Sequence, residues 1–84
     1  MERLDEAGAM AGLDEGPEAL FKLGMMYSTG VMAPPDYIAA HKWFNLAAMH
    51  GYKEAIRLRR EIAALMSEAE ISAAQRAARD WIGR

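Results

Sequence analysis

Apolar residues recur at helical spacing in four consecutive segments of the chain, and glycine, proline and serine residues separate these segments. The first predicted helix begins at Pro17, a residue suited to the first helical position, and ends before Gly30. The second begins after Asp36, a favourable N-cap residue, and runs to about His50. The pattern therefore predicts two helices joined by a proline-containing loop.

Two further helices are predicted in the C-terminal part of the chain. The third covers residues 52–66 and follows Gly51, which can adopt the left-handed conformation that ends the second helix. The segment Ser67-Glu68-Ala69-Glu70 has the sequence of a capping box, in which a serine and a glutamate three residues later satisfy each other's backbone N–H groups. A new helix therefore starts after Ser67 and is predicted to extend to residue 82.

The second predicted helix has the broadest apolar face. Its members are Ile38, Ala40, Trp43, Phe44, Ala47 and Ala48. A face of this width exceeds what one neighbour can cover, so the second helix is predicted to lie between neighbours. The third helix has the stripe Ala55, Leu58, Ile62 and Leu65, and the fourth has Ile71, Ala74, Ala78, Trp81 and Ile82.

The first predicted helix carries two apolar stripes. One contains Leu20, Leu23, Gly24 and Tyr27, and Gly24 lets the second helix approach closely because it lacks a Cβ. The other contains Phe21 and Met25, four residues apart, and the second helix alone cannot bury both stripes. The N-terminal segment, a second copy or a partner must then cover Phe21 and Met25, and we expect a partner or a second copy. The remaining methionines are assigned as follows: Met26 and Met66 to core gaps, and Met32 and Met49, like Met25, to the surface.

Composition agrees with the helical pattern and limits the size of the fold. The chain has 84 residues, with 17 alanines against seven β-branched residues, a balance that favours helices in one small all-α domain. It has no cysteine, which excludes disulfides and cysteine chemistry and suits a reducing compartment. The acidic N-terminus and the lack of a long apolar stretch predict a cytoplasmic protein without a membrane partner.

The charges are distributed unevenly along the chain. The net charge is −2, which favours no nucleic-acid partner. Residues 1–50 carry seven acidic and three basic side chains, whereas residues 51–84 carry five acidic and seven basic ones. The two ends of the molecule are therefore expected to attract each other.

No set of residues suited to catalysis or metal binding emerges from the sequence. His41 and His50 are nine residues apart on one predicted helix and lie on opposite faces, so they cannot bind one metal ion. Glutamates at helical neighbour spacing accompany the basic residues Arg57, Arg59 and Arg60, which favours ion pairs within the helix over nucleic-acid binding. No enzyme activity, metal or cofactor is predicted.

The segment from Ala19 to Gly51 resembles a Sel1-like repeat, a tetratricopeptide-like helical repeat. The residues that carry the resemblance are Ala19, Leu23, Gly24, Tyr27 and Gly30, followed by Asp36, Ala40, Trp43, Phe44, Ala47, Ala48 and Gly51. The resemblance implies a short right-handed α-solenoid of antiparallel helix pairs. It divides the single domain into an N-terminal remnant or coil (1–15), the repeat (16–51) and a C-terminal capping helix pair (52–84), because Arg59 and Arg60 replace the residues aligned with Leu23 and Gly24.

The resemblance also implies a function, because repeats of this kind serve as adaptors and scaffolds. We expect a non-catalytic protein interaction module that presents a small groove to a peptide or partner domain. The expected groove residues are Glu18, Phe21, Lys22, Met25 and Ser28 on the first helix, with Glu54, Arg57 and Glu61 on the third. The alternative is a self-associating structural module, a homodimer or an end-to-end stack, that needs no separate ligand.

Overall fold

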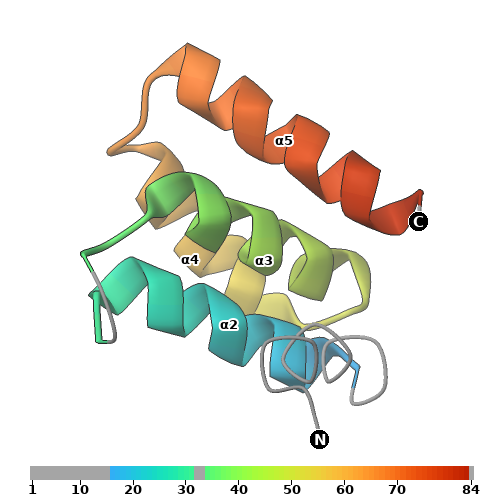
Figure 1. Cartoon of the computed structure of the whole chain (residues 1–84). Coiled ribbons are helices and arrows are strands. Elements are labelled where there is room, and N and C mark those ends of the chain that lie inside the picture. Colours follow the sequence, from blue (N-terminus) through green and yellow to red (C-terminus); the bar gives the residue numbers. More distant parts are fainter. Residues whose placement is uncertain (1–15, 32–33, 84) are drawn as a thin grey trace, which may run out of the picture.

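A computed structural model describes residues 16–31 and 34–83, which form four helices arranged around the second of them (Figure 1). The helices are α2 (Pro17–Thr29), α3 (Tyr37–Met49), α4 (Lys53–Ala63) and α5 (Glu68–Ile82). In Figure 1, α3 lies in the middle, with α2 below it, α4 behind it and α5 above it. The all-α class is confirmed, and no strand occurs in the described residues. The predicted N-terminal remnant or coil (1–15) and Met32 lie outside the described residues.

The boundaries of α2 and α3 follow from the residues that cap them. Gly30 ends α2 in the left-handed conformation, with φ 72°. The side chain of Asp36 accepts a hydrogen bond from the Ala39 N–H at 3.0 Å, and its own N–H donates to the Tyr27 carbonyl at 2.9 Å. Asp36 therefore both starts α3 and ties it to the end of α2.

The capping box at Ser67 is confirmed, and it shortens the helix before it. Ser67 Oγ accepts a hydrogen bond from the Glu70 N–H at 3.1 Å, while Glu70 Oε1 accepts one from the Ser67 N–H at 2.9 Å. The preceding helix, α4, ends at Ala63 rather than at the predicted Met66, because the chain tightens into turns before it reaches the extended Ser67. Leu65 consequently leaves the predicted stripe and is 65% exposed.

Helix α3 contributes most of the core, as the width of its apolar face predicts. Its buried residues are Ala40, His41, Trp43, Phe44, Leu46 and Ala47. Each of α2, α4 and α5 packs on α3, and the other pairs of described helices make few contacts. The prediction that this helix lies between neighbours is confirmed.

The last two helices do not pack on each other as the predicted capping pair. Helix α5 packs on α3 instead, because Ala74 and Ala78 give it a small buried face that permits close approach. At the end of this contact, the rings of Trp43 and Trp81 meet edge to face with centroids 5.0 Å apart. Helix α4 also packs on α3. The apolar faces of α4 and α5, which were predicted to pack on each other, therefore both contact α3.

Three more apolar side chains lie nearer to solvent than predicted. Met26 was expected to fill a core gap but is 43% exposed, Tyr27 is 41% exposed and Ile82 is 53% exposed. Helices α2 and α5 each pack extensively only on α3 among the described helices, so side chains that turn away from α3 stay exposed. Met25 and Met49 are exposed and Met66 packs against the core, as predicted.

The close approach predicted at Gly24 is confirmed. An ideal Cβ placed on Gly24 would lie 2.5 Å from two ring carbons of Phe44, much less than the 3.5 to 4.0 Å of a normal carbon contact. Phe44 is 1% exposed, so its ring is enclosed by the core. A hydrogen atom is therefore the only side chain that fits this point of the α2/α3 contact.

We expect Gly24→Ala to lower the free energy of unfolding by about 1 to 2 kcal/mol, because overpacking costs about 1 to 3 kcal/mol and the gain in helix propensity offsets part of it. In a Phe44→Leu background the same substitution should be neutral or stabilising, since the ring is gone. Chemical denaturation of the four variants measures this coupling, with Gly83→Ala at the exposed end of α5 as the control. Equal costs in both backgrounds would refute the close-contact argument.

Candidate functional site

The predicted site residues on α2 divide between solvent and the interior. Glu18, Lys22 and Met25 are exposed, whereas Phe21 and Ser28 are half-buried. The Ser28 hydroxyl donates to the Met25 carbonyl at 3.1 Å, so it is satisfied within its own helix. The exposed part of this face therefore consists of one apolar side chain, Met25, beside two charged ones.

Phe21 is covered by the chain itself. Its ring lies 4.4 Å from the ring of Tyr52, the residue before α4, and 5.6 Å from the ring of Phe44, measured between centroids. The expectation that Phe21 needs a partner, a second copy or the N-terminal segment to cover it is therefore wrong: spacing along α2 separates it from the main stripe, but Tyr52 fills the space beside it. Met25 follows one turn later on the same flank and is 37% exposed.

The predicted site residues on α4 form an ion-pair triad. Arg57 Nη2 pairs with Glu54, and Arg57 Nη1 pairs with Glu61 Oε2 at 2.8 Å. The hydrogen bond from Arg57 holds the pKa of Glu54 below its ordinary value, and the two glutamates raise the pKa of Arg57. Of the predicted pairs within the helix, those of Arg57 are confirmed, and its exposed guanidinium is held in a defined orientation.

The start of α4 lies against the flank of α2 that carries Phe21. Phe21 belongs to α2 and Tyr52 immediately precedes α4, and their rings touch. Met25 shares the flank of α2 that carries Phe21, and the Arg57 triad lies on the solvent side of α4. We call this surface, formed by Glu18, Lys22, Met25, Glu54, Arg57 and Glu61, the α2/α4 surface.

Two polar contacts of α3 were not predicted. Arg59 Nη1 donates to Asn45 Oδ1 at 2.7 Å between α4 and α3, so the arginine that replaces an apolar repeat residue is satisfied where it is half-buried. Lys42 Nζ lies 4.2 Å from the ring centroid of Trp43 and 5.7 Å from that of Trp81. The hydrogen bond between Arg59 and Asn45 and the contact between Lys42 and Trp81 join residues far apart in the sequence, and the repeat pattern pointed only to the first, through the unusual position of Arg59.

His41 lies in the interior of the fold. It is 4% exposed, and its Nδ1 has no hydrogen-bond partner in the described part of the chain. Burial, and secondarily the charge of Arg59, lower the pKa of His41. His50 is exposed at the end of α3, so the two histidines are well separated. Among residues 16–31 and 34–83, no cluster of acidic and histidine residues could hold a metal ion.

Comparison with known proteins assigns a family to part of the chain. Residues 17–52, from the start of α2 to the residue before α4, match the Sel1 repeat family. No curated protein and no solved structure matches the chain significantly. In addition, none of the helices in the described residues is long and apolar enough to cross a membrane. The resemblance inferred from the sequence is confirmed for residues 17–52.

Phe21 and Met25 should differ in their effect on folding. We expect Phe21→Ala to lower the free energy of unfolding by about 2 kcal/mol or more, because it removes a ring packed between two others. Met25→Ala should change it by less than about 0.5 kcal/mol, because the side chain is exposed. Urea denaturation of the two single variants tests this contrast, and similar losses in both would contradict it.

The burial of His41 predicts an acid-sensitive stability. Its pKa is lower in the folded than in the unfolded chain, so the unfolded chain takes up the extra proton as the pH falls below about 6.5. The free energy of unfolding should therefore be fully retained above that pH and decrease below it, by at most about 1.4 kcal/mol per pH unit. We expect His41→Gln, but not the exposed His50→Gln, to reduce the difference in stability between about pH 7.5 and 5.5. An unchanged difference in His41→Gln would rule out this origin.

Proposed function

We propose that this chain, in which residues 17–52 form a Sel1 repeat, is a non-catalytic adaptor that binds a peptide or partner domain on the α2/α4 surface. Sel1 repeats are generally protein–protein interaction modules. The observation that carries the choice of surface is the contact between Phe21 and Tyr52, which brings the start of α4, the helix of the ion-paired Arg57, to the flank of α2 that carries Met25. An oriented arginine and an exposed methionine are both suited to contacts between proteins.

The organisation of the α2/α4 surface supports this proposal. Ordering a long side chain on binding costs about 0.5 to 1.5 kcal/mol, and the two glutamates reduce that cost for Arg57 because they already restrict it. Met25 is unbranched and adapts its shape to different apolar partners. Phe21 lies beneath as part of the core and supports the surface from within. The triad of two glutamates and one arginine carries a net negative charge, so a peptide with an apolar anchor for Met25 and a basic group for the triad has the complementary chemistry.

The proposed role involves no catalysis, cofactor or metal. The sequence contains no cysteine, which supports a cytoplasmic location because disulfides rarely form in that reducing compartment. Self-association, as a homodimer or end-to-end stack, is the alternative to a separate partner. It would use two surfaces of one chain and would depend on protein concentration and salt.

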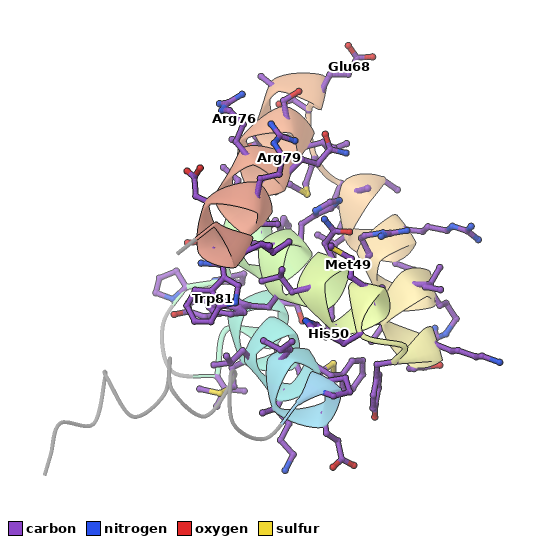
Figure 2. All side chains as sticks on the ribbon, turned by 90° about the vertical axis from the view of Figure 1, so that its right-hand side faces the viewer. Met49, His50, Glu68, Arg76, Arg79 and Trp81 are labelled. Atoms are coloured by element: carbon purple, nitrogen blue, oxygen red, sulfur yellow. The ribbon has the colours of Figure 1, made fainter. Side chains whose placement is uncertain are left out.

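We expect a double variant, Met25→Ala/Arg57→Ala, to lose partner binding while the fold is retained. The matched control is Met49→Ala/Arg76→Ala, which removes an exposed methionine and an exposed arginine from α3 and α5 (Figure 2). The wild-type chain, cross-linked in its native extract, identifies the partner, and titration of the purified partner then gives the affinity of each variant. Loss of two anchor residues should weaken binding by more than about 1 kcal/mol, or about fivefold.

Three measurements keep this experiment decisive. Circular dichroism of both double variants establishes that the helices are intact. Equal affinity of the two double variants for the partner would refute the α2/α4 surface as the binding site. Sedimentation at two salt concentrations detects the alternative, because a chain that associates only with itself would form a salt-dependent homo-oligomer and retain no partner.

A further inference from the structure

In the described part of the chain, two of the three arginines of α4 lack a carboxylate partner. The helix contains two glutamates, Glu54 and Glu61, and both pair with Arg57. Within residues 16–31 and 34–83, no carboxylate pairs with Arg59 or Arg60. The basic cluster therefore contains two arginines whose charge no described carboxylate balances.

Arg59 and Arg60 have different surroundings. Arg60 is exposed, so water hydrates its charge, whereas Arg59 is half-buried at the contact of α4 with α3. Its Nη1 donates a hydrogen bond to Asn45 Oδ1 of α3 at 2.7 Å, and this partner is neutral. Arg57 precedes Arg59 by two residues, or about 200° around the helix axis, so the ion-pair triad lies on another side of α4. A partly desolvated charge without a counter-charge is costly, which singles out Arg59.

A buried histidine beside Arg59 lacks a partner as well. His41 precedes Asn45 by one turn on the same face of α3, and it is 4% exposed. Its Nδ1 has no hydrogen-bond partner among the described residues, although buried polar atoms are rarely left unpaired. Burial, and secondarily the charge of Arg59, lower the pKa of His41. The contact between α3 and α4 thus contains an unbalanced cation and an unpaired buried nitrogen.

A carboxylate has the chemistry that this contact lacks. The guanidinium of Arg59 has further N–H donors in a fixed fork, which matches the two oxygens of a carboxylate. Asn45 uses its oxygen to accept from Arg59, so its NH₂ group remains to donate. Hydrogen bonds from both groups to one anion would be charge-assisted, and the anion would offset the positive charge that acts on His41.

Apolar side chains flank Arg59 on its own helix. Ile56 and Ala63 lie three residues before it and four residues after it, a spacing that places all three on one side of α4. Both are half-buried and keep part of their surface in solvent. A bound segment therefore gains apolar contacts in addition to its ion pair, whereas a free small carboxylate does not.

We propose that Arg59 and Asn45 bind an acidic side chain of a partner protein, whose apolar neighbours contact Ile56 and Ala63. We call these four residues and His41 the Arg59 site. One carboxylate suits it better than nucleic acid, because binding to nucleic acid depends on many phosphate contacts and the two glutamates of α4 would repel a polyanion. The source of the carboxylate rests on the proposed function, but the site uses none of the residues of the α2/α4 surface.

Titration of the full chain with a short acidic peptide tests the Arg59 site. The probe is a leucine–glutamate–leucine tripeptide with blocked ends, and the same peptide with glutamine is its neutral control. In NMR spectra at constant ionic strength, only the glutamate peptide should shift the signals of the Arg59 Nε–H and the Asn45 amide in a saturable manner. It should also bind at least about fivefold more tightly than acetate and than inorganic phosphate.

A matched pair of substitutions locates the bound carboxylate. We expect Arg59→Gln to weaken binding of the glutamate peptide by at least about fivefold, because it removes the fork of donors. Arg60→Gln makes the same change of charge at the exposed neighbour and should weaken binding by less than about twofold. Circular dichroism of both variants establishes that the helices are intact.

His41 provides a readout in the unaltered chain, so the test does not depend on a variant that folds. The bound carboxylate offsets the charge of Arg59, so the pKa of His41 should rise when the glutamate peptide saturates the site. The ring signals of His50, which is exposed at the end of α3 (Figure 2), should not shift at constant pH. An unchanged pKa of His41 at saturation would overturn the proposed position of the carboxylate.

The other outcomes are equally decisive. Equal binding of the glutamate and glutamine peptides, or equal losses in Arg59→Gln and Arg60→Gln, would overturn the site. Acetate or phosphate that binds as tightly as the peptide would overturn the protein source of the anion. The Met25→Ala/Arg57→Ala variant should bind the tripeptide within about twofold of the wild-type chain, so failure of the α2/α4 surface and failure of the Arg59 site are distinguishable.

Discussion

The contact between Gly24 and the ring of Phe44 sets the geometry on which the rest of the structure depends. Phe44 fills the space that a side chain at Gly24 would occupy, so α2 and α3 approach closely enough to bury Leu20 and Ala40 between them. The same ring contacts Phe21, which in turn contacts Tyr52. One aromatic side chain of α3 thereby connects α2 with the start of α4, and it does so from a helix that α5 covers on another side. A small domain gains much of its stability from such a shared residue, because it has little apolar surface to bury elsewhere.

Local sequence signals predicted the helices well because they act within a few residues. Asp36 and Ser67 bond to N–H groups three residues away, and Gly30 ends α2 through its own backbone conformation. Packing between helices was predicted less well, since periodicity identifies an apolar stripe but not the helix that covers it. The pairing of α4 with α5 was wrong for this reason: Ala74 and Ala78 allow close approach to any helix, and contact between Trp43 and Trp81 places α5 on α3.

In the candidate site, too, contacts within one helix were predicted from the sequence and contacts between helices were not. The pairs of Arg57 with Glu54 and Glu61 follow from spacing along one helix, so the sequence predicted them correctly. The position of Phe21 depends on Tyr52, which lies 31 residues later in the chain and reaches it only after α3 reverses the chain direction. Likewise, Arg59 departs from the repeat pattern, but its bond to Asn45 appears only when α4 lies against α3. Contacts between side chains on different helices can be predicted only when the fold is known. The residue types on one face of a helix can be predicted from the sequence alone.

Helix α2 has two flanks outside its contact with α3, because α3 covers it along only one face. Its two flanks differ in the neighbours available to them: Tyr52 lies against Phe21 on one side, whereas no described helix packs extensively beside Met26 on the other. The close contact at Gly24 leaves α2 little freedom to rotate about its axis. The residues on each flank therefore keep the same surroundings. The two flanks of α2 therefore present different surfaces: Phe21 packs against Tyr52 on one, whereas Met26 is exposed on the other. This separation follows from a glycine and an aromatic ring, and it requires no additional repeat.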